Sequence, residues 1–224
     1  MHWSDTGYLL SKINYSENSI IIDVFTSKYG KFSGIVYGGS SKKNKKDLQI
    51  GNKILVNFKS KNENKIGYFS TELIEPISPY FFDNRKKTLC ILSASSILKI
   101  ILPERQTHYK IFLSFEDLIS KLFTNEWILP FIYWEQLLVK ELGFDFNLSK
   151  LKETYQEMKS KIITINGVKL KVPDIFFLNQ SDKITNNQIK EALQFNKKLF
   201  IENFFDGNVY KIPKSRSFLE NSFI

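Results

Sequence analysis

The sequence predicts an α+β multidomain protein in which a small five-stranded β-barrel precedes a helical domain that contains a short β-hairpin. In residues 1–80, apolar and polar positions alternate with the period of two that is typical of strands. After Pro76 and Pro79 the apolar positions recur every three to four residues, as they do in helices. The predicted domains are therefore residues 1–80 and residues 81–224.

Five short strands are expected in the first domain, because β-branched and aromatic residues alternate there and turn sequences separate the runs. The expected strands cover residues 7–13, 19–25, 31–37, 53–59 and 67–75. One long connection lies between the third and fourth strands. This arrangement favours an N-terminal OB-fold β-barrel, a fold that binds nucleic acids in many proteins, and an SH3-like barrel is the alternative.

The second domain is expected to be mainly helical. Residues 84–102 are apolar almost all round, which indicates a buried helix. Apolar stripes with helical spacing predict further helices over residues 110–123 and 126–142, and Gly143 fits the position just after the second of these. Two or three further helices are expected, over about residues 187–205 and 214–222.

A small hairpin interrupts this helical domain near residues 159–172. Asn166 and Gly167 lie between two runs of β-branched residues, and Asn-Gly in that setting is the strongest short signal for a two-residue hairpin turn.

The composition excludes several classes of protein. Hydrophobic residues make up 42% of the 224, enough for a packed core. Cys90 is the only cysteine, which excludes an intramolecular disulfide and a cysteine-rich zinc site and indicates a cytosolic protein. Residues 1–5 do not begin a signal peptide, and the most apolar stretch, residues 88–98, is shorter than the roughly 20 residues that cross a membrane. We therefore expect a cytoplasmic protein without a membrane contact.

Positive charge is concentrated in one segment. Eight lysines lie between Lys42 and Lys65, against two acids, Asp47 and Glu63, so this segment carries most of the formal net charge of +9. A lysine run is often only a solvated surface. Here, however, it falls in a barrel connection, which we expect to be a loop rather than a helix face, and OB-fold barrels bind single strands with basic grooves and stacking aromatics.

These observations predict a nucleic-acid interface on the barrel. Lysine supplies point charge without the geometry that reads bases, so binding should be independent of sequence and steeply dependent on salt. The aromatic side chains considered for base stacking are Tyr29, Phe32, Tyr37 and Tyr68. The residues expected to bind DNA are Lys42, Lys43, Lys45, Lys46, Lys59, Lys61, Lys65 and Tyr37.

No catalytic constellation is apparent in the sequence. Of the two histidines, His2 lies at the terminus and His108 follows the turn at residues 103–105, and the carboxylates are scattered, with Asp145 alone near aromatic residues. Residues 38–43 lack the glycine spacing of a phosphate-binding P-loop. We therefore expect neither an enzyme nor a bound cofactor or metal, and a hydrolase such as a nuclease is the least favoured alternative.

The order of motifs resembles the RecO family of bacterial recombination and repair mediators. The resemblance includes LPERQTH at residues 102–108 and WEQLLVKELGF at residues 134–144. The other similar segments are residues 3–11, 25–42, 48–52, 198–202 and 216–219. Some relatives hold zinc with cysteines after the Leu-Gly-Phe segment, whereas residues 148–153 of this chain contain none, so zinc is not expected.

This resemblance implies a nucleoid-associated mediator of DNA repair and homologous recombination that binds single- and double-stranded DNA and anneals complementary strands. It also implies partnership with RecR and with the C-terminal tail of single-strand binding protein, to help load RecA on coated DNA. The expected docking groove for that tail involves Trp134, Leu138 and Lys140 in the helical domain. The main alternative is an OB-fold RNA-binding module of translation or RNA processing.

Overall fold

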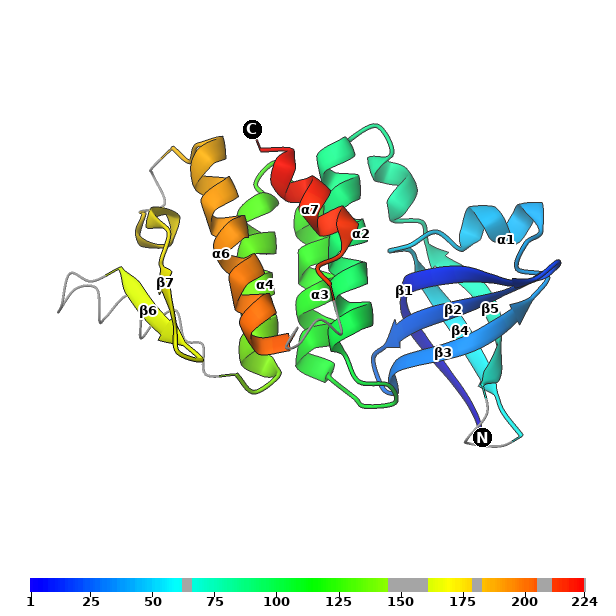
Figure 1. The fold of residues 1–224 in the computed structure, drawn as a ribbon. Coiled ribbons are helices and arrows are strands. Elements are labelled where there is room, and N and C mark those ends of the chain that lie inside the picture. Colours follow the sequence, from blue (N-terminus) through cyan, green and yellow to red (C-terminus); the bar gives the residue numbers. More distant parts are fainter. Residues whose placement is uncertain (62–65, 145–160, 179–182, 205–210, 224) are drawn as a thin grey trace. The chain divides into compact units, whose positions relative to one another are not determined.

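The computed structural model describes residues 1–61, 66–144, 161–178, 183–204 and 211–223 (Figure 1). The chain forms two compact units, residues 1–113 and residues 114–224. The first holds a β-barrel and one long helix, and the second is mainly helical. The predicted domain boundary at residue 80 stays a prediction. Lys65, Asp145 and residues 148–153 lie outside the described residues.

The barrel is closed by five strands, as the sequence predicts. They are β1 (His2–Ser16), β2 (Ser19–Thr26), β3 (Gly30–Tyr37), β4 (Lys53–Lys59) and β5 (Gly67–Glu75). Their order around the barrel is β1-β2-β3-β5-β4, with β3 and β5 parallel and the other neighbours antiparallel. This order is that of an OB-fold barrel, so the SH3-like alternative is discarded.

Strand β1 is longer than predicted because it pairs on both sides. Residues 2–8 pair with β4, and residues 7–16 pair with β2. Gly7 lies where the two ladders overlap, and a Cβ atom there would come within 2.5 Å of the Phe25 carbonyl oxygen. Only glycine fits this close approach of two strands.

The barrel interior is filled by the alternating apolar residues. Ile22 and Val24 of β2, and Ile54 and Val56 of β4, are completely buried. Trp3 completes this core and stacks on Phe58 with ring centroids 5.1 Å apart. The inward-facing rows predicted for β2 and β4 are therefore confirmed.

The first four lysines of the run are helical, which corrects the prediction that they lie in a loop rather than on a helix face. Residues Lys42–Asp47 form helix α1, which lies against the barrel (Figure 1). Ser41 caps this helix by accepting a hydrogen bond from the Asn44 backbone N–H, and the Asn44 side chain donates to the Gly38 carbonyl at 2.9 Å. Leu48, directly after the helix, is buried in the barrel core. Caps and one apolar anchor thus hold a helix that has no apolar stripe.

Helix α2 (Arg85–Ile101) packs against β1 and is anchored by a polar network on the outer face of the barrel. The strand register places Ser11, Asp23 and Ser33 side by side on β1, β2 and β3. Both serine hydroxyls donate to the Asp23 carboxylate at 2.5 Å, and the Lys99 ammonium of α2 lies 3.2 Å from it. Burial alone would raise the pKa of Asp23, but these hydrogen bonds and the Lys99 charge lower it overall.

Replacing Asp23 with asparagine is expected to destabilise the first unit by roughly 1.5–3 kcal/mol at neutral pH, the usual range for hydrogen bonds to a charged group. Because the folded-state pKa is lowered, the stabilisation is present above the unfolded value near 3.9 and is lost as the pH falls through the lower folded value. Urea unfolding of both proteins between about pH 3 and pH 7 measures this. The exposed Asp83→Asn serves as the control, and a pH-independent difference would contradict the assignment.

The second unit contains helices α4, α6 and α7, together with most of α3, whose residues begin in the first unit. Their bounds are Tyr109–Leu122 for α3, Ile128–Glu141 for α4, Asn186–Phe204 for α6 and Lys214–Asn221 for α7. The predicted stripe on α3 is buried. Gly143 ends α4 with φ +92°, and the backbone N–H groups of Gly143 and Phe144 donate to the Lys140 and Val139 carbonyls, as predicted for a glycine-terminated helix.

The predicted hairpin is confirmed as strands β6 (Ile162–Ile165) and β7 (Val168–Lys171). Asn166 and Gly167 both have positive φ, 48° and 82°, as a type I′ turn requires. A short 3₁₀ turn, η2 (Asp174–Phe177), follows β7, and another, η1 (Ser78–Phe81), precedes α2 in the first unit. Within the described ranges, no helix is long and apolar enough to span a membrane.

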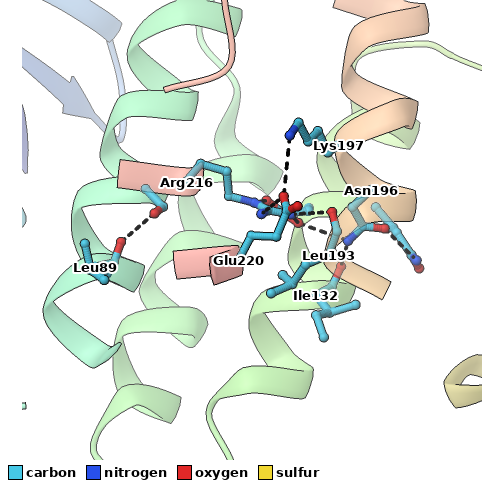
Figure 2. A network of polar contacts seen from close by, with 10 residues as sticks. Leu89, Ile132, Leu193, Asn196, Lys197, Arg216 and Glu220 are labelled. Atoms are coloured by element: carbon cyan, nitrogen blue, oxygen red, sulfur yellow. Dashed lines mark hydrogen bonds and ion pairs between the residues drawn. The ribbon is translucent and has the colours of Figure 1, made fainter. Parts of the chain in front are cut away.

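A completely buried arginine joins three helices of the second unit. Figure 2 shows Arg216 of α7 surrounded by groups from α4 and α6. Its guanidinium donates to both carboxylate oxygens of Glu135 at 2.5 and 3.0 Å and to the Leu193 carbonyl at 2.7 Å. Glu220 lies 3.5 Å away as a second acid, and Asn196 donates to Glu135 at 3.0 Å. The bidentate pairing and the Asn196 donor to Glu135 offset much of the cost of burying these charges, while the Arg216 Nη1 has no hydrogen-bond partner among the described residues.

Candidate nucleic-acid interface

Helix α1 presents an exposed cluster of positive charge. The side chains of Lys42, Lys43, Lys45 and Lys46 are all exposed. None of these ammonium groups makes an ion pair with a carboxylate in the described part of the chain. The cluster is thus exposed and can neutralise phosphate groups, and it projects from a helix rather than from the predicted loop.

Two stacked tyrosines are exposed on the same barrel, and one of them, Tyr37, ends the strand that precedes α1. Tyr37 ends β3 and Tyr68 lies on the adjacent strand β5, with ring centroids 5.1 Å apart and ring planes inclined by 22°. Their exposed fractions are 65% and 42%. A hydrogen bond with Tyr68 is the main cause that raises the pKa of Tyr37. A stacked and exposed aromatic pair offers a flat surface on which nucleic-acid bases can stack.

The tyrosine pair lies between two barrel connections. Tyr37 is opposite Ser19, directly after the turn that joins β1 to β2, and Tyr68 is opposite Lys59 near the connection from β4 to β5. OB-folds bind oligonucleotides on the face of strands 2 and 3, flanked by these two connections. Lys59 and Lys61 are exposed at this end of the barrel.

The other aromatic candidates are part of the barrel core. Phe32 is buried, and Tyr29 stacks on Trp3 with ring centroids 4.2 Å apart. The sequence prediction missed Tyr15, which is 59% exposed and close enough to raise the pKa of Tyr37. It was missed because β1 continues to Ser16, through residues that were expected to form the turn.

The structure corrects the predicted partner groove on α4. Trp134 and Leu138 are 4% and 0% exposed, so they are core residues and do not present their side chains to a partner. Lys140 is exposed as expected. Tyr133 and Leu137, which precede Lys140 by seven and three residues, are the exposed apolar side chains on this helix. Both lie on the same face of the helix as Lys140, and each directly precedes one residue of the predicted pair, Trp134 and Leu138.

No group of three or more histidine, cysteine or acidic side chains that could hold a metal ion occurs among the described residues. The buried Nε2 atom of His108 has no hydrogen-bond partner among the residues that the structure describes. Burial lowers the pKa of this imidazole. The described barrel surface offers exposed positive charge and a stacked pair of aromatic rings.

The sequence is similar to that of known DNA repair proteins. The family model "Recombination protein O N terminal" matches residues 1–77, which include the barrel strands. The DNA repair protein RecO of Wolbachia pipientis subsp. Culex pipiens (strain wPip) is 29% identical over 208 residues, covering 87% of this chain and 84% of the relative. The proteins of the same name from Caulobacter vibrioides (strain NA1000 / CB15N) and Cereibacter sphaeroides (strain ATCC 17025 / ATH 2.4.3) are 32% and 30% identical over 155 residues. Each alignment covers 69% of this chain, with 64% and 65% of the respective relatives.

Proposed function

The chain belongs to the RecO family, whose named members are DNA repair proteins, and from this premise we propose that it is a mediator of DNA repair and homologous recombination. In this role it binds single- and double-stranded DNA without sequence preference and anneals complementary strands. The observation that carries the proposal is the presence, on one barrel, of the exposed lysine cluster of α1 and the exposed, stacked Tyr37–Tyr68 pair.

Annealing requires two mutually repelling strands to come within pairing distance. Lysines on α1 neutralise phosphates and release condensed counterions, which is a favourable contribution that weakens as salt concentration rises. Lysine lacks the planar guanidinium group of arginine, which can form two parallel hydrogen bonds to guanine or to a phosphate group. The contact between lysine and phosphate therefore does not select a sequence. The protein lowers the repulsion between strands and makes or breaks no covalent bond.

The tyrosine pair should distinguish single strands from duplexes. Replacing Tyr37 and Tyr68 with alanine is expected to weaken single-strand binding by about 1–3 kcal/mol for each base that stacks on the pair. Duplex binding should change little, because its bases already stack on one another. Fluorescence anisotropy with matched single- and double-stranded oligomers measures the difference.

The controls for this experiment are Tyr37→Phe, which keeps an aromatic ring, and Tyr80→Ala, which removes an exposed tyrosine from η1. Both are expected to bind single strands like the wild type. Equal losses for single strands and duplexes would show that the pair contributes something other than base stacking.

The proposed partners are RecR, the acidic C-terminal tail of single-strand binding protein and, through them, RecA. The exposed face formed by Tyr133, Leu137 and Lys140 supports a contact with such a tail, since it combines apolar side chains with a positive charge. This face replaces Trp134 and Leu138 in the proposal. Alanine substitution of Leu137 together with Lys140 is the direct test for this contact.

A strand-annealing assay tests the proposed function. The protein is expected to accelerate annealing of complementary oligonucleotides, both bare and coated with single-strand binding protein, and to leave labelled DNA intact in the presence of Mg²⁺. An annealing rate equal to the spontaneous rate would contradict the proposal. Preferential binding of RNA in competition with DNA of the same sequence would favour the RNA-binding alternative.

A further inference from the structure

A hollow of about 300 Å³ lies between helix α1 and the barrel. Its polar lining comes from separate parts of the chain that the fold brings together. Lys12 and Asn14 belong to β1, Ser40 precedes α1, Lys45 lies on α1, and Gln49 follows it. No carboxylate is among the described residues that line it.

Two positive charges converge on this hollow. The Lys12 ammonium is held in place by donating to the Leu48 carbonyl at 2.7 Å. Desolvation lowers the pKa of Lys12, and the neighbouring charge of Lys45 lowers it further. The two ammonium groups therefore repel each other, and an anion placed between them would remove this repulsion.

Neutral hydrogen-bonding groups also face the hollow. The side chains of Ser40 and Asn14 have no hydrogen-bond partner within the described ranges. The Gln49 amide is held by donating to the Lys45 carbonyl. A hydroxyl, an amide and two ammonium groups around one small hollow match the oxygen atoms of a phosphate group.

A second hollow, of about 200 Å³, adjoins the first and shares Lys12 and Gln49 with it. Its other lining residues are mostly apolar and include Ile50, Ile91 and Phe82. Phe82 is 61% exposed, which is unusual for a phenylalanine ring beside a hollow. An apolar hollow with an exposed aromatic ring suits a nucleobase.

We propose that these two hollows form one nucleotide subsite, in which a phosphate group lies between Lys12 and Lys45 and the attached base contacts Phe82. The subsite deepens the proposed function and rests on it for the identity of the polymer. A nucleotide held in this way is seated at a defined place on the barrel, whereas Lys42, Lys43 and Lys46 attract the backbone over the exposed surface of α1. The chemistry of the site is the same for a free nucleotide and for one nucleotide within a strand.

Nuclear magnetic resonance titrations of the full chain test the subsite with three probes: inorganic phosphate, thymidine 5′-monophosphate and an oligothymidine. Phosphate is expected to shift the signals of Ser40, Lys45 and Gln49. The monophosphate is expected to shift these and also the Phe82 signals. The oligothymidine should cause the same shifts at lower concentration, because neighbouring phosphates bind to further lysines. Shifts spread evenly over all exposed lysines would overturn the proposal.

Variants separate the two halves of the subsite. Lys12→Ala and Lys45→Ala are each expected to weaken binding of phosphate and of the monophosphate by about tenfold, consistent with removal of one charged hydrogen bond. Lys45→Ala leaves the bond from Lys12 to Leu48 intact, so it reports on the site even if Lys12→Ala loosens α1. Phe82→Ala should weaken only the monophosphate. Lys28→Ala, an exposed lysine in the β2–β3 turn, should bind both probes like the wild type.

The subsite and the proposed function fail in different ways. If the wild-type protein anneals DNA and the Lys12, Lys45 and Phe82 variants bind the phosphate and monophosphate probes as the wild type does, the subsite is overturned. The proposed function is not affected by that result. Localised binding of the monophosphate by a protein that neither binds nor anneals DNA would support the nucleotide subsite and overturn the function.

Discussion

A variant in which Lys42, Lys43, Lys45 and Lys46 are all replaced by glutamate is expected to bind single-stranded DNA on the order of a hundredfold more weakly at low salt. These four ammonium groups are exposed, make no ion pair in the described part of the chain, and lie on one short helix. The slope of log affinity against log salt should also become shallower, by about 0.7 for each phosphate that the variant no longer neutralises. Anisotropy titrations at several salt concentrations measure both quantities.

A matched variant distinguishes the local effect of α1 from the effect of net charge. Replacing the exposed Lys169, Lys171, Lys183 and Lys198 of the second unit with glutamate changes the net charge by the same amount. This control is expected to retain most of the affinity and of the salt slope. Equal reductions in the two variants would show that total charge, and not the α1 cluster, determines binding.

The largest effect on stability is expected from removing the acid that pairs with the buried arginine. Glu135→Ala leaves the Arg216 guanidinium, which is 0% exposed, without its bidentate partner. Breaking one side of a buried ion pair typically costs about 3–5 kcal/mol, since the remaining charge stays in a poorly solvated place. Chemical denaturation followed by the tryptophan signals of the second unit measures the change, and a destabilisation below about 1 kcal/mol would contradict this account.

Two further variants separate the buried charge from ordinary ion pairing. Glu135→Leu combined with Arg216→Met removes both charges and is expected to recover a large part of the stability, as apolar replacements of buried ion pairs often do. Asp174→Asn removes the exposed pair between Lys161 and Asp174, 2.7 Å apart, and should cost less than about 1 kcal/mol.

The elements that the sequence predicted well are those with a regular apolar pattern. The apolar residues of β2 and β4 alternate along the strand, and the helices of the second unit bury an apolar stripe, so their periods reveal them. The start of β1 was missed because its alternating buried position is Asp5. This acid accepts hydrogen bonds from the Lys28 backbone N–H at 2.8 Å and from the Ser27 hydroxyl at 3.1 Å. In the sequence, an aspartate is normally interpreted as a surface residue, and the hydrogen bonds from a turn more than 20 residues away that allow its burial cannot be seen there.

The candidate site shows a similar limit. Helix α1 is held by the Ser41 cap and by the buried Leu48 rather than by an apolar stripe. Such a short helix has no apolar period in the sequence, so the sequence predicts a loop there. The burial of Arg216 was equally hidden, since its partner Glu135 lies 81 positions away in sequence. In contrast, the clustering of lysines is itself a sequence property, and their exposure follows from the absence of apolar neighbours within α1.

The central claim is that this chain binds DNA through the phosphate groups of the DNA and without sequence preference. Affinities for two single-stranded oligomers of equal length and unrelated sequence, measured over a range of salt concentrations, test it most directly. The account predicts equal affinities, and a steep decrease with rising salt that has the same slope for both oligomers. Affinities that differ strongly between the two sequences, or that hardly change with salt, would contradict it.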